Sequence, residues 1–70
     1  TYVIKKSIYR YISFFMYDYP VTLTLKNFKY ELNEYLLKNQ DTLCISNELI
    51  GDSGTVSFSN GSLLIVESKD

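Results

Sequence analysis

The sequence predicts an α+β fold, a small mixed or antiparallel sheet of four to five strands with one helix packed across it. Three observations support this prediction. Segments that alternate apolar and polar side chains indicate strands, and an Asn-Gly pair at residues 60–61 indicates a tight turn. Residues 25–36 carry apolar side chains at spacings of three and four, which is typical of an amphipathic helix.

The opening segment, residues 2–19, is predicted to be a long aromatic strand. Its apolar residues also fit a helical stripe, so periodicity alone leaves both structures open. Isoleucine, tyrosine and phenylalanine dominate it, and these residues favour pleated surfaces. Because side chains alternate along a strand, one face would carry Tyr9, Tyr11, Phe15 and Tyr17.

The middle of the chain is predicted to contain a short strand that runs into the helix. Pro20 ends the preceding segment, and residues 21–25 alternate as a strand does. Thr24 is the expected N-cap of the helix over residues 25–36. Asn39 is an acceptable residue at which to end it.

The last part of the chain is predicted to be rich in strands. Residues 41–50 alternate in polarity and contain Cys44, which we expect to be a small buried side chain. Residues 55–58 and 63–66 flank the Asn-Gly pair, whose residues suit the positive φ angles of a type I′ turn. We therefore expect these two segments to pair as a β-hairpin.

Size and composition limit the classes of protein to consider. Residues 1–70 amount to one small α+β domain at most, and because the chain starts at Thr1 it can also be a fragment of a longer chain. One cysteine and no histidine exclude an intrachain disulfide and an ordinary zinc site. No apolar run is long enough to span a bilayer, and no secretory signal is present. We expect an intracellular, cytoplasmic protein without cofactor or metal.

The order of the predicted elements resembles the β-grasp fold of ubiquitin-like domains. The stretch VTLTLKNF at residues 21–28 is similar to the entry from strand into helix in these domains, including the C-terminal ubiquitin-fold domain of the activating enzymes for ubiquitin-like proteins. The resemblance implies a non-enzymatic module that recognises a protein partner through an aromatic sheet face or edge. The binding candidates are Tyr9, Tyr11, Phe15 and Tyr17.

Two alternatives use other partners. Residues 9–14 resemble the aromatic core of the ribonucleoprotein motif of RNA-recognition domains, in which rings stack on bases. Tyr9, Tyr11 and Phe15 would then bind nucleic acid while Lys5, Lys6 and Arg10 contact phosphates. A small phage-type or toxin-neutralising inhibitor is the second alternative. Without histidine, paired cysteines or a glycine-rich phosphate loop, we expect no enzymatic activity.

Overall fold

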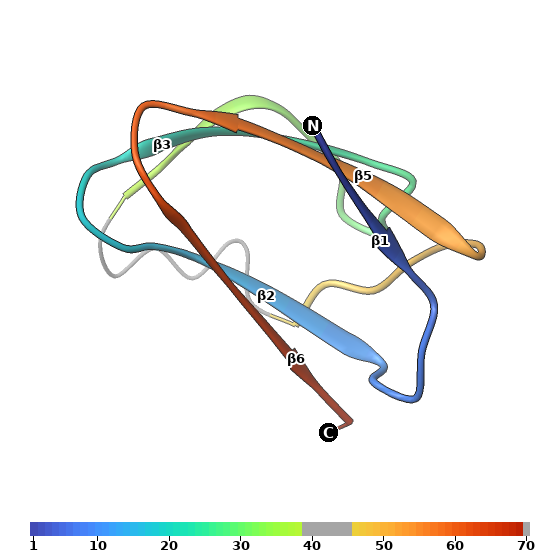
Figure 1. Cartoon of the computed structure of the whole chain (residues 1–70). Helices are drawn as coiled ribbons and strands as arrows, with labels where there is room; N and C mark the ends of the chain where they lie inside the picture. Colours follow the sequence, from blue (N-terminus) through green and yellow to red (C-terminus); the bar gives the residue numbers. More distant parts are fainter. Residues whose placement is uncertain (39–45, 70) are drawn as a thin grey trace.

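The computed structural model describes residues 1–38 and 46–69, and the fold within these ranges is all-β. Its strands are β1 (Tyr2–Lys5), β2 (Tyr11–Met16), β3 (Val21–Lys26), β4 (Leu32–Leu37), β5 (Ser53–Ser59) and β6 (Leu63–Ser68). One sheet has the order β1-β5-β3-β4 and the other pairs β2 with β6, all antiparallel. Figure 1 shows the sheets as two layers, with β1, β3 and β5 above β2 and β6. The fold is therefore a small β-sandwich.

The predicted helix over residues 25–36 is wrong, and the α+β class is wrong with it. No helix occurs in the described ranges, and β3 and β4 occupy this part of the chain. A β-bulge in β4 explains the error, because it places an extra residue between the partly buried Leu32 and Tyr35. The bulge includes Glu34, which has a φ of 50° and whose N–H donates to Thr24 Oγ1 at 3.0 Å. The extra residue places two core-facing apolar side chains of a strand three positions apart, which is the spacing expected of an amphipathic helix.

The opening segment forms two strands where one was predicted. Residues 6–10 leave β1 in the four-stranded sheet and enter β2 in the two-stranded sheet. Within β2 the predicted alternation is present, since Ile12 and Phe14 are buried while Tyr11 and Phe15 lie on the other face. The single long strand is thus wrong, although the division of β2 into two faces agrees with the sequence pattern.

The hairpin predicted at the Asn-Gly pair is also wrong. Asn60 and Gly61 have positive φ angles of 70° and 143°, as a turn at this place requires. The strands that they connect belong to different sheets, because β5 pairs with β1 and β3 whereas β6 pairs with β2. The turn is a corner of the sandwich.

A second connection, between β2 and β3, lies beside this corner. The Tyr17 N–H donates to the Ser62 carbonyl at 3.0 Å, and Asp18 Oδ1 accepts from the N–H groups of Ser62 and Tyr19 at 3.0 and 2.9 Å. The ribbon of β3 and β5 thereby continues around the corner into the ribbon of β2 and β6. One backbone hydrogen bond and two to the Asp18 side chain therefore stabilise this end of the sandwich.

The core lies between the two sheets. Phe14 from the small sheet meets Phe28 edge-on, with ring centroids 5.7 Å apart and ring planes at 78°. Gly54 faces this pair, since a Cβ there would lie 2.6 Å from the Phe28 ring. The other buried apolar residues are Ile4, Ile12, Val21, Leu23, Leu25, Leu37 and Val56.

The strand predicted over residues 41–50 lies partly outside the described residues, as do Asn39 and Cys44. Its described part, residues 46–50, makes only isolated bridges to other strands or turns. In the described ranges there is also no helix long and apolar enough to cross a membrane.

Candidate functional site

A short extended segment, residues 46–50, connects the two sheets at one end of the sandwich. Asn47 and Ile12 exchange backbone hydrogen bonds of 2.8 Å in both directions. Leu49 forms a second bridge with Phe28, just after β3. We call residues 46–50 the bridging segment, because it touches a strand of one sheet and the end of a strand of the other.

Asn47 fixes the bridging segment through its side chain. It is the one buried polar residue among those that the structure describes, with 2% of its surface exposed. Its Oδ1 accepts from the N–H groups of Tyr30 and Glu48 at 3.0 and 2.9 Å, and its Nδ2 donates to the Tyr30 carbonyl at 2.9 Å. A buried amide with these partners pins the segment to the turn that precedes β4.

Backbone strain lies on both sides of the segment. Ser46 has a φ of 59° and Asn27, whose carbonyl accepts from the Ile50 N–H at 3.1 Å, has a φ of 66°. Non-glycine residues seldom adopt this left-handed region, and asparagine adopts it more readily than serine. The Ser46 N–H donates to Ser13 Oγ on β2 at 3.0 Å. Strain of this kind often occurs at functional sites.

Charged side chains gather on the bridging segment around Glu48. Its carboxylate is 3.1 Å from Arg10 Nε and 3.6 Å from Lys29 Nζ. The hydrogen bond from Arg10, together with the positive charges of Arg10 and Lys29, holds the pKa of Glu48 below its ordinary value. Glu48 is therefore an anion at neutral pH.

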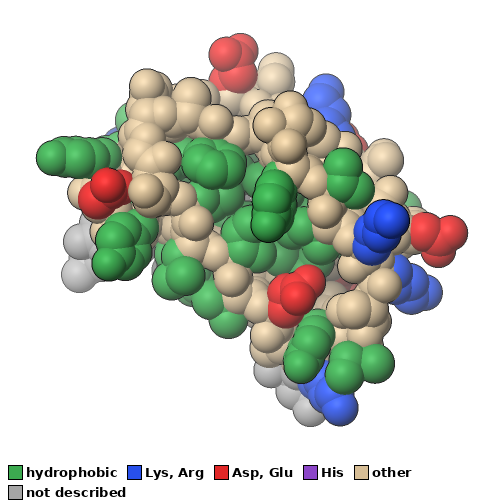
Figure 2. All heavy atoms as spheres, viewed as in Figure 1, with side chains coloured by type: hydrophobic (Ala, Val, Ile, Leu, Met, Phe, Trp, Pro, Cys, Tyr) green, Lys and Arg blue, Asp and Glu red, His purple; other side chains and the backbone are tan. Residues whose placement is uncertain are grey.

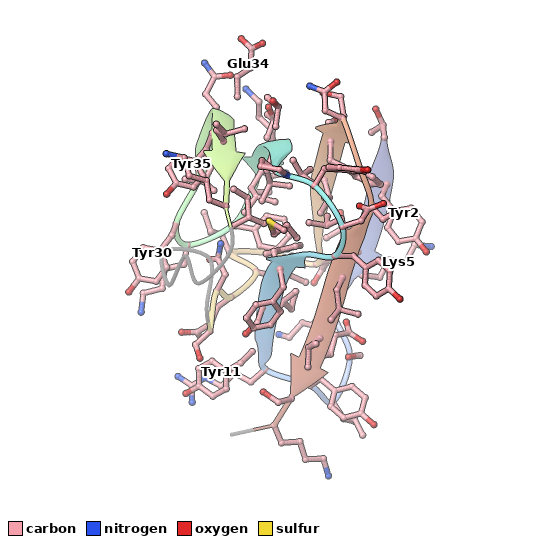
Figure 3. All side chains as sticks on the ribbon, turned by 90° about the vertical axis from the view of Figure 1, so that its left-hand side faces the viewer. Tyr2, Lys5, Tyr11, Tyr30, Glu34 and Tyr35 are labelled. Atoms are coloured by element: carbon pink, nitrogen blue, oxygen red, sulfur yellow. The ribbon has the colours of Figure 1, made fainter. Side chains whose placement is uncertain are left out.

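Two tyrosine rings flank this ionic group. The Arg10 guanidinium lies 5.3 Å from the centroid of the Tyr11 ring, and Lys29 Nζ lies 5.5 Å from that of Tyr30. Figure 3 shows Tyr11 and Tyr30 projecting from the same side of the molecule. We call the five side chains the bridging cluster, which comprises Arg10, Tyr11, Lys29, Tyr30 and Glu48.

A pocket of about 290 Å³ adjoins the bridging cluster. Its polar wall comes from the 6–10 connection and from the turn after the bridging segment: Lys6, Ser7, Tyr9, Arg10, Gly51 and Asp52. Leu49 and Ile50 form its apolar wall. The Lys6 N–H donates to the Asp52 carbonyl at 2.8 Å, which joins the two walls. We call this cavity the Lys6 pocket.

A larger groove of about 640 Å³ lies between β1 and β6. The two-stranded sheet does not cover this part of the four-stranded sheet, so Tyr2 and Phe58 stay 60% and 44% exposed. Leu63 and Ile65 form its other side. Figure 2 shows hydrophobic side chains gathered across this face.

The structure brings together some of the predicted binding residues and separates others. Lys6, Tyr9 and Arg10 line the Lys6 pocket, whereas Lys5 lines the groove. Tyr11 and Phe15 share the outer face of β2. Tyr17 lies beyond β2 at the corner and is 74% exposed, so the predicted four-ring face does not form.

Sequence reasoning missed Lys29, Tyr30, Asn47 and Glu48. The first two were assigned to a helix, and nothing in the sequence separates Asn47 from the other asparagines. No group of three or more candidate metal ligands occurs among residues 1–38 and 46–69.

Comparison with known proteins gives a family and close structural relatives. Residues 1–63 match the family model described as thiamin pyrophosphokinase, vitamin B1 binding domain. A thiamine pyrophosphokinase of Bacillus subtilis (strain 168) is 48% identical over 62 residues, which are 87% of this chain and 29% of that protein. The chain thus spans about a third of this relative's length.

Two solved structures have the same fold. The crystal structure of thiamine pyrophosphokinase from Bacillus subtilis matches with a TM-score of 0.92 and 46% identity, over 99% of this chain and 33% of that one. The corresponding structure from Geobacillus thermodenitrificans matches with a TM-score of 0.88 and 42% identity, again over 99% and 33%.

These matches correct the functional expectations from sequence. The resemblance to ubiquitin-like domains is wrong, because both the family match and the all-β fold point elsewhere. We expected a protein-binding, nucleic-acid-binding or inhibitor function. The relatives contradict this, because they are named thiamine pyrophosphokinase, an enzyme named for a small molecule. The expectation of a non-enzymatic protein is wrong for the same reason.

Proposed function

The chain belongs to the family of thiamin pyrophosphokinase vitamin B1 binding domains, and from this premise we propose that it binds thiamine within an enzyme that transfers a pyrophosphoryl group to it. The observation that carries the proposal is the family match over residues 1–63. The shared fold, at a TM-score of 0.92, supports it. Because the chain aligns with about a third of these relatives, the proposal concerns one part of such an enzyme.

We place the thiamine contact at the bridging cluster. Thiamine consists of a flat aminopyrimidine ring joined to a cationic thiazolium ring. The ionised carboxylate of Glu48 complements the cation, and the rings of Tyr11 and Tyr30 offer aromatic surfaces beside it. Arg10 and Lys29 have side chains that are 67% and 56% exposed, so both can turn aside for a cationic ligand.

The rigidity of the bridging segment supports this placement. Binding sites need side chains whose positions are fixed before the ligand arrives. Asn47 fixes the backbone of both Tyr30 and Glu48, one on each side of the cluster. The groove between β1 and β6 has no comparable polar support in its described contacts, so we favour the cluster.

Calorimetric titration of the whole protein with thiamine tests the proposal. Glu48→Gln keeps the shape of the side chain and removes its charge, so we expect the Kd for thiamine to rise about tenfold, which corresponds to about 1.4 kcal/mol. Glu34→Gln is the matched control, since Glu34 is an exposed glutamate on β4 outside the cluster.

Two results would contradict the proposal at different levels. If the unsubstituted protein binds no thiamine, the proposed function is wrong. If it binds thiamine and Glu48→Gln leaves the Kd unchanged, the function stands and its placement at the bridging cluster is wrong.

We also propose that the protein works in the cytoplasm. A chain with one cysteine and no intrachain disulfide fits a reducing compartment. Cell fractionation followed by immunoblotting tests this, and recovery of the protein outside the cytoplasmic fraction would contradict it.

A further inference from the structure

The turn at the corner of the sandwich carries an Asn-Gly pair that the proposed function does not use. Asn60 and Gly61 lie between β5 and β6, and both residues are exposed. Within residues 1–38 and 46–69, neither the Asn60 side chain nor the Gly61 N–H has a hydrogen-bond partner. The side-chain amide of Asn60 and the backbone nitrogen that follows it are therefore both accessible for a reaction with each other.

An asparagine side chain can close a ring on the backbone nitrogen of the next residue. That nitrogen loses its proton to hydroxide and bonds to the side-chain carbon Cγ, and the Cγ–Nδ2 bond breaks to release ammonia. Water then opens the resulting succinimide at one of its two carbonyl carbons. Attack at Cγ leaves aspartate, whereas attack at the main-chain carbon leaves isoaspartate, in which the chain runs through the former side chain. Either product carries one new negative charge.

Asn60 is the asparagine of this chain that best meets the needs of the reaction. The chain has five asparagines, and only Asn60 precedes a glycine. A glycine has no side chain to shield the attacking nitrogen, and its backbone adapts readily to ring closure. Asn47 is buried, and its amide both donates and accepts hydrogen bonds. Asn33 is exposed but precedes Glu34, so it provides an internal comparison for the reactivity of Asn60.

Isoaspartate would disturb the corner, because it lengthens the backbone by one methylene group where two connections touch. A Cβ at Gly61 would lie 3.1 Å from the Tyr19 carbonyl oxygen and 3.4 Å from Asp18 Oδ1, so the connections already pack closely. The next residue, Ser62, accepts a hydrogen bond from Tyr17 and donates one to Asp18. The new carboxylate would also add a negative charge one residue away from the contact with Asp18.

We propose that Asn60-Gly61 is a site of spontaneous deamidation, and that the isoaspartate formed there weakens the corner that joins the two sheets. β6 follows the turn and pairs with β2, so the two-stranded sheet loses its tie to the rest of the sandwich. The enzyme class that would recognise the product is an isoaspartyl methyltransferase, which esterifies the carboxylate of isoaspartate. This inference does not depend on thiamine binding.

Incubation of the whole protein at neutral and at mildly alkaline pH, followed by peptide mass spectrometry, tests the reaction. We expect the peptide with Asn60 to gain the mass difference between NH2 and OH several times faster than the peptide with Asn33. The product should accept a methyl group from isoaspartyl methyltransferase. Its rate of formation should rise with pH, because the attacking nitrogen must lose its proton.

Asn60→Gly is the matched variant, since glycine adopts the φ of 70° freely and has no amide to react. It should accept no methyl group at this position. Equal rates at Asn33 and Asn60 would overturn the proposed site. It would also be overturned if the folded protein stays unmodified while a synthetic peptide of residues 57–64 reacts.

Urea denaturation of the separated isoaspartate form tests the effect on the corner. We expect it to unfold at a lower urea concentration than fresh protein, whereas incubated Asn60→Gly keeps its fresh midpoint. Freshly prepared Asn60→Asp carries the charge without the longer backbone, so its midpoint should fall less. An unchanged midpoint for the isoaspartate form would overturn the effect on the corner. An equal fall in Asn60→Asp would overturn the longer backbone as its cause.

Discussion

Asn47 and Tyr30 form a reciprocal pair of hydrogen bonds, in which the Asn47 side chain both donates to and accepts from the Tyr30 backbone at 2.9 and 3.0 Å. Tyr30 lies in the turn before β4 and Asn47 in the bridging segment. Two irregular pieces of chain, far apart in sequence, are thus held by one amide.

Asn47→Ala should destabilise the protein by about 2–4 kcal/mol, because a buried side chain is removed and three partly buried backbone groups lose their hydrogen-bond partner. Urea denaturation measures this loss. Asn33→Ala, an exposed asparagine on β4, is the control and should stay within about 0.5 kcal/mol of the parent. Equal stability of the two variants would show that water replaces the amide at no cost.

Gly54→Ala should destabilise the protein by about 1–3 kcal/mol through overpacking. The new methyl group would lie 2.6 Å from the Phe28 ring and 2.7 Å from the Leu49 side chain, both of which pack in or against the core. Gly51→Ala makes the same chemical change in open space and should leave the thermal midpoint almost unchanged. A similar fall in Tm for both variants would contradict crowding as the cause, because a Cβ at Gly51 meets no atom within 4 Å.

Asn27 has a strained backbone conformation, so the effect of a substitution there on stability should depend on which residue replaces it. At a φ of 66°, Asn27→Ala is expected to cost about 1 kcal/mol, because alanine tolerates the left-handed region poorly. Asn27→Gly should stay near the parent, since glycine adopts this region freely. Chemical denaturation of the pair measures the difference. Should alanine prove as stable as glycine, the left-handed conformation does not persist in solution.

Low pH should destabilise the corner between the sheets, because protonation of Asp18 weakens the hydrogen bonds that its carboxylate accepts there. A hydrogen bond from the Ser62 N–H, followed by that from Tyr19, holds the pKa of Asp18 below its ordinary value. A carboxylate with a depressed pKa in the folded state contributes stability above its unfolded pKa, near 3.9, and loses that contribution as the pH falls through the folded value. Glu48 acts in the same direction.

Asp18→Asn should therefore flatten the loss of stability below about pH 4, measured as the urea midpoint between about pH 3 and pH 7. Glu67→Gln removes an exposed carboxylate elsewhere and controls for net charge. A profile for Asp18→Asn that is as steep as that of the parent would assign the acid sensitivity to other groups.

Local patterns predicted local features of this fold and failed at long range. The alternation of residues within β2 and the strand that begins at Val21 are present, and Asn60 and Gly61 adopt the positive φ angles that their chemistry favours. These local patterns could not predict which strands pair with each other. A turn sets the local direction of the chain. The pairing of β5 with β1 and β3, and of β6 with β2, depends instead on packing between strands that are distant in sequence.

The false helix has a specific cause. A bulged strand and an amphipathic helix both place apolar residues three apart, and the bulge at Glu34 produces this spacing between Leu32 and Tyr35. Lys6, Tyr9 and Arg10 were predicted as binding residues and do meet at one pocket. The other half of the candidate site was not predictable, because Asn47 and Glu48 acquire their roles only when the bridging segment meets β2 and the turn before β4.

The pairing of the strands also bears on how the chain folds during synthesis. β1 pairs with β5 and β2 pairs with β6, so the first two strands find their neighbours only near the other end of the sequence. Loops of this length are slow to close, and folding rates fall as such distant contacts dominate. On the ribosome, β1 and β2 stay without their partner strands until β5 and β6 emerge, and during that interval their unpaired edges and apolar side chains favour aggregation.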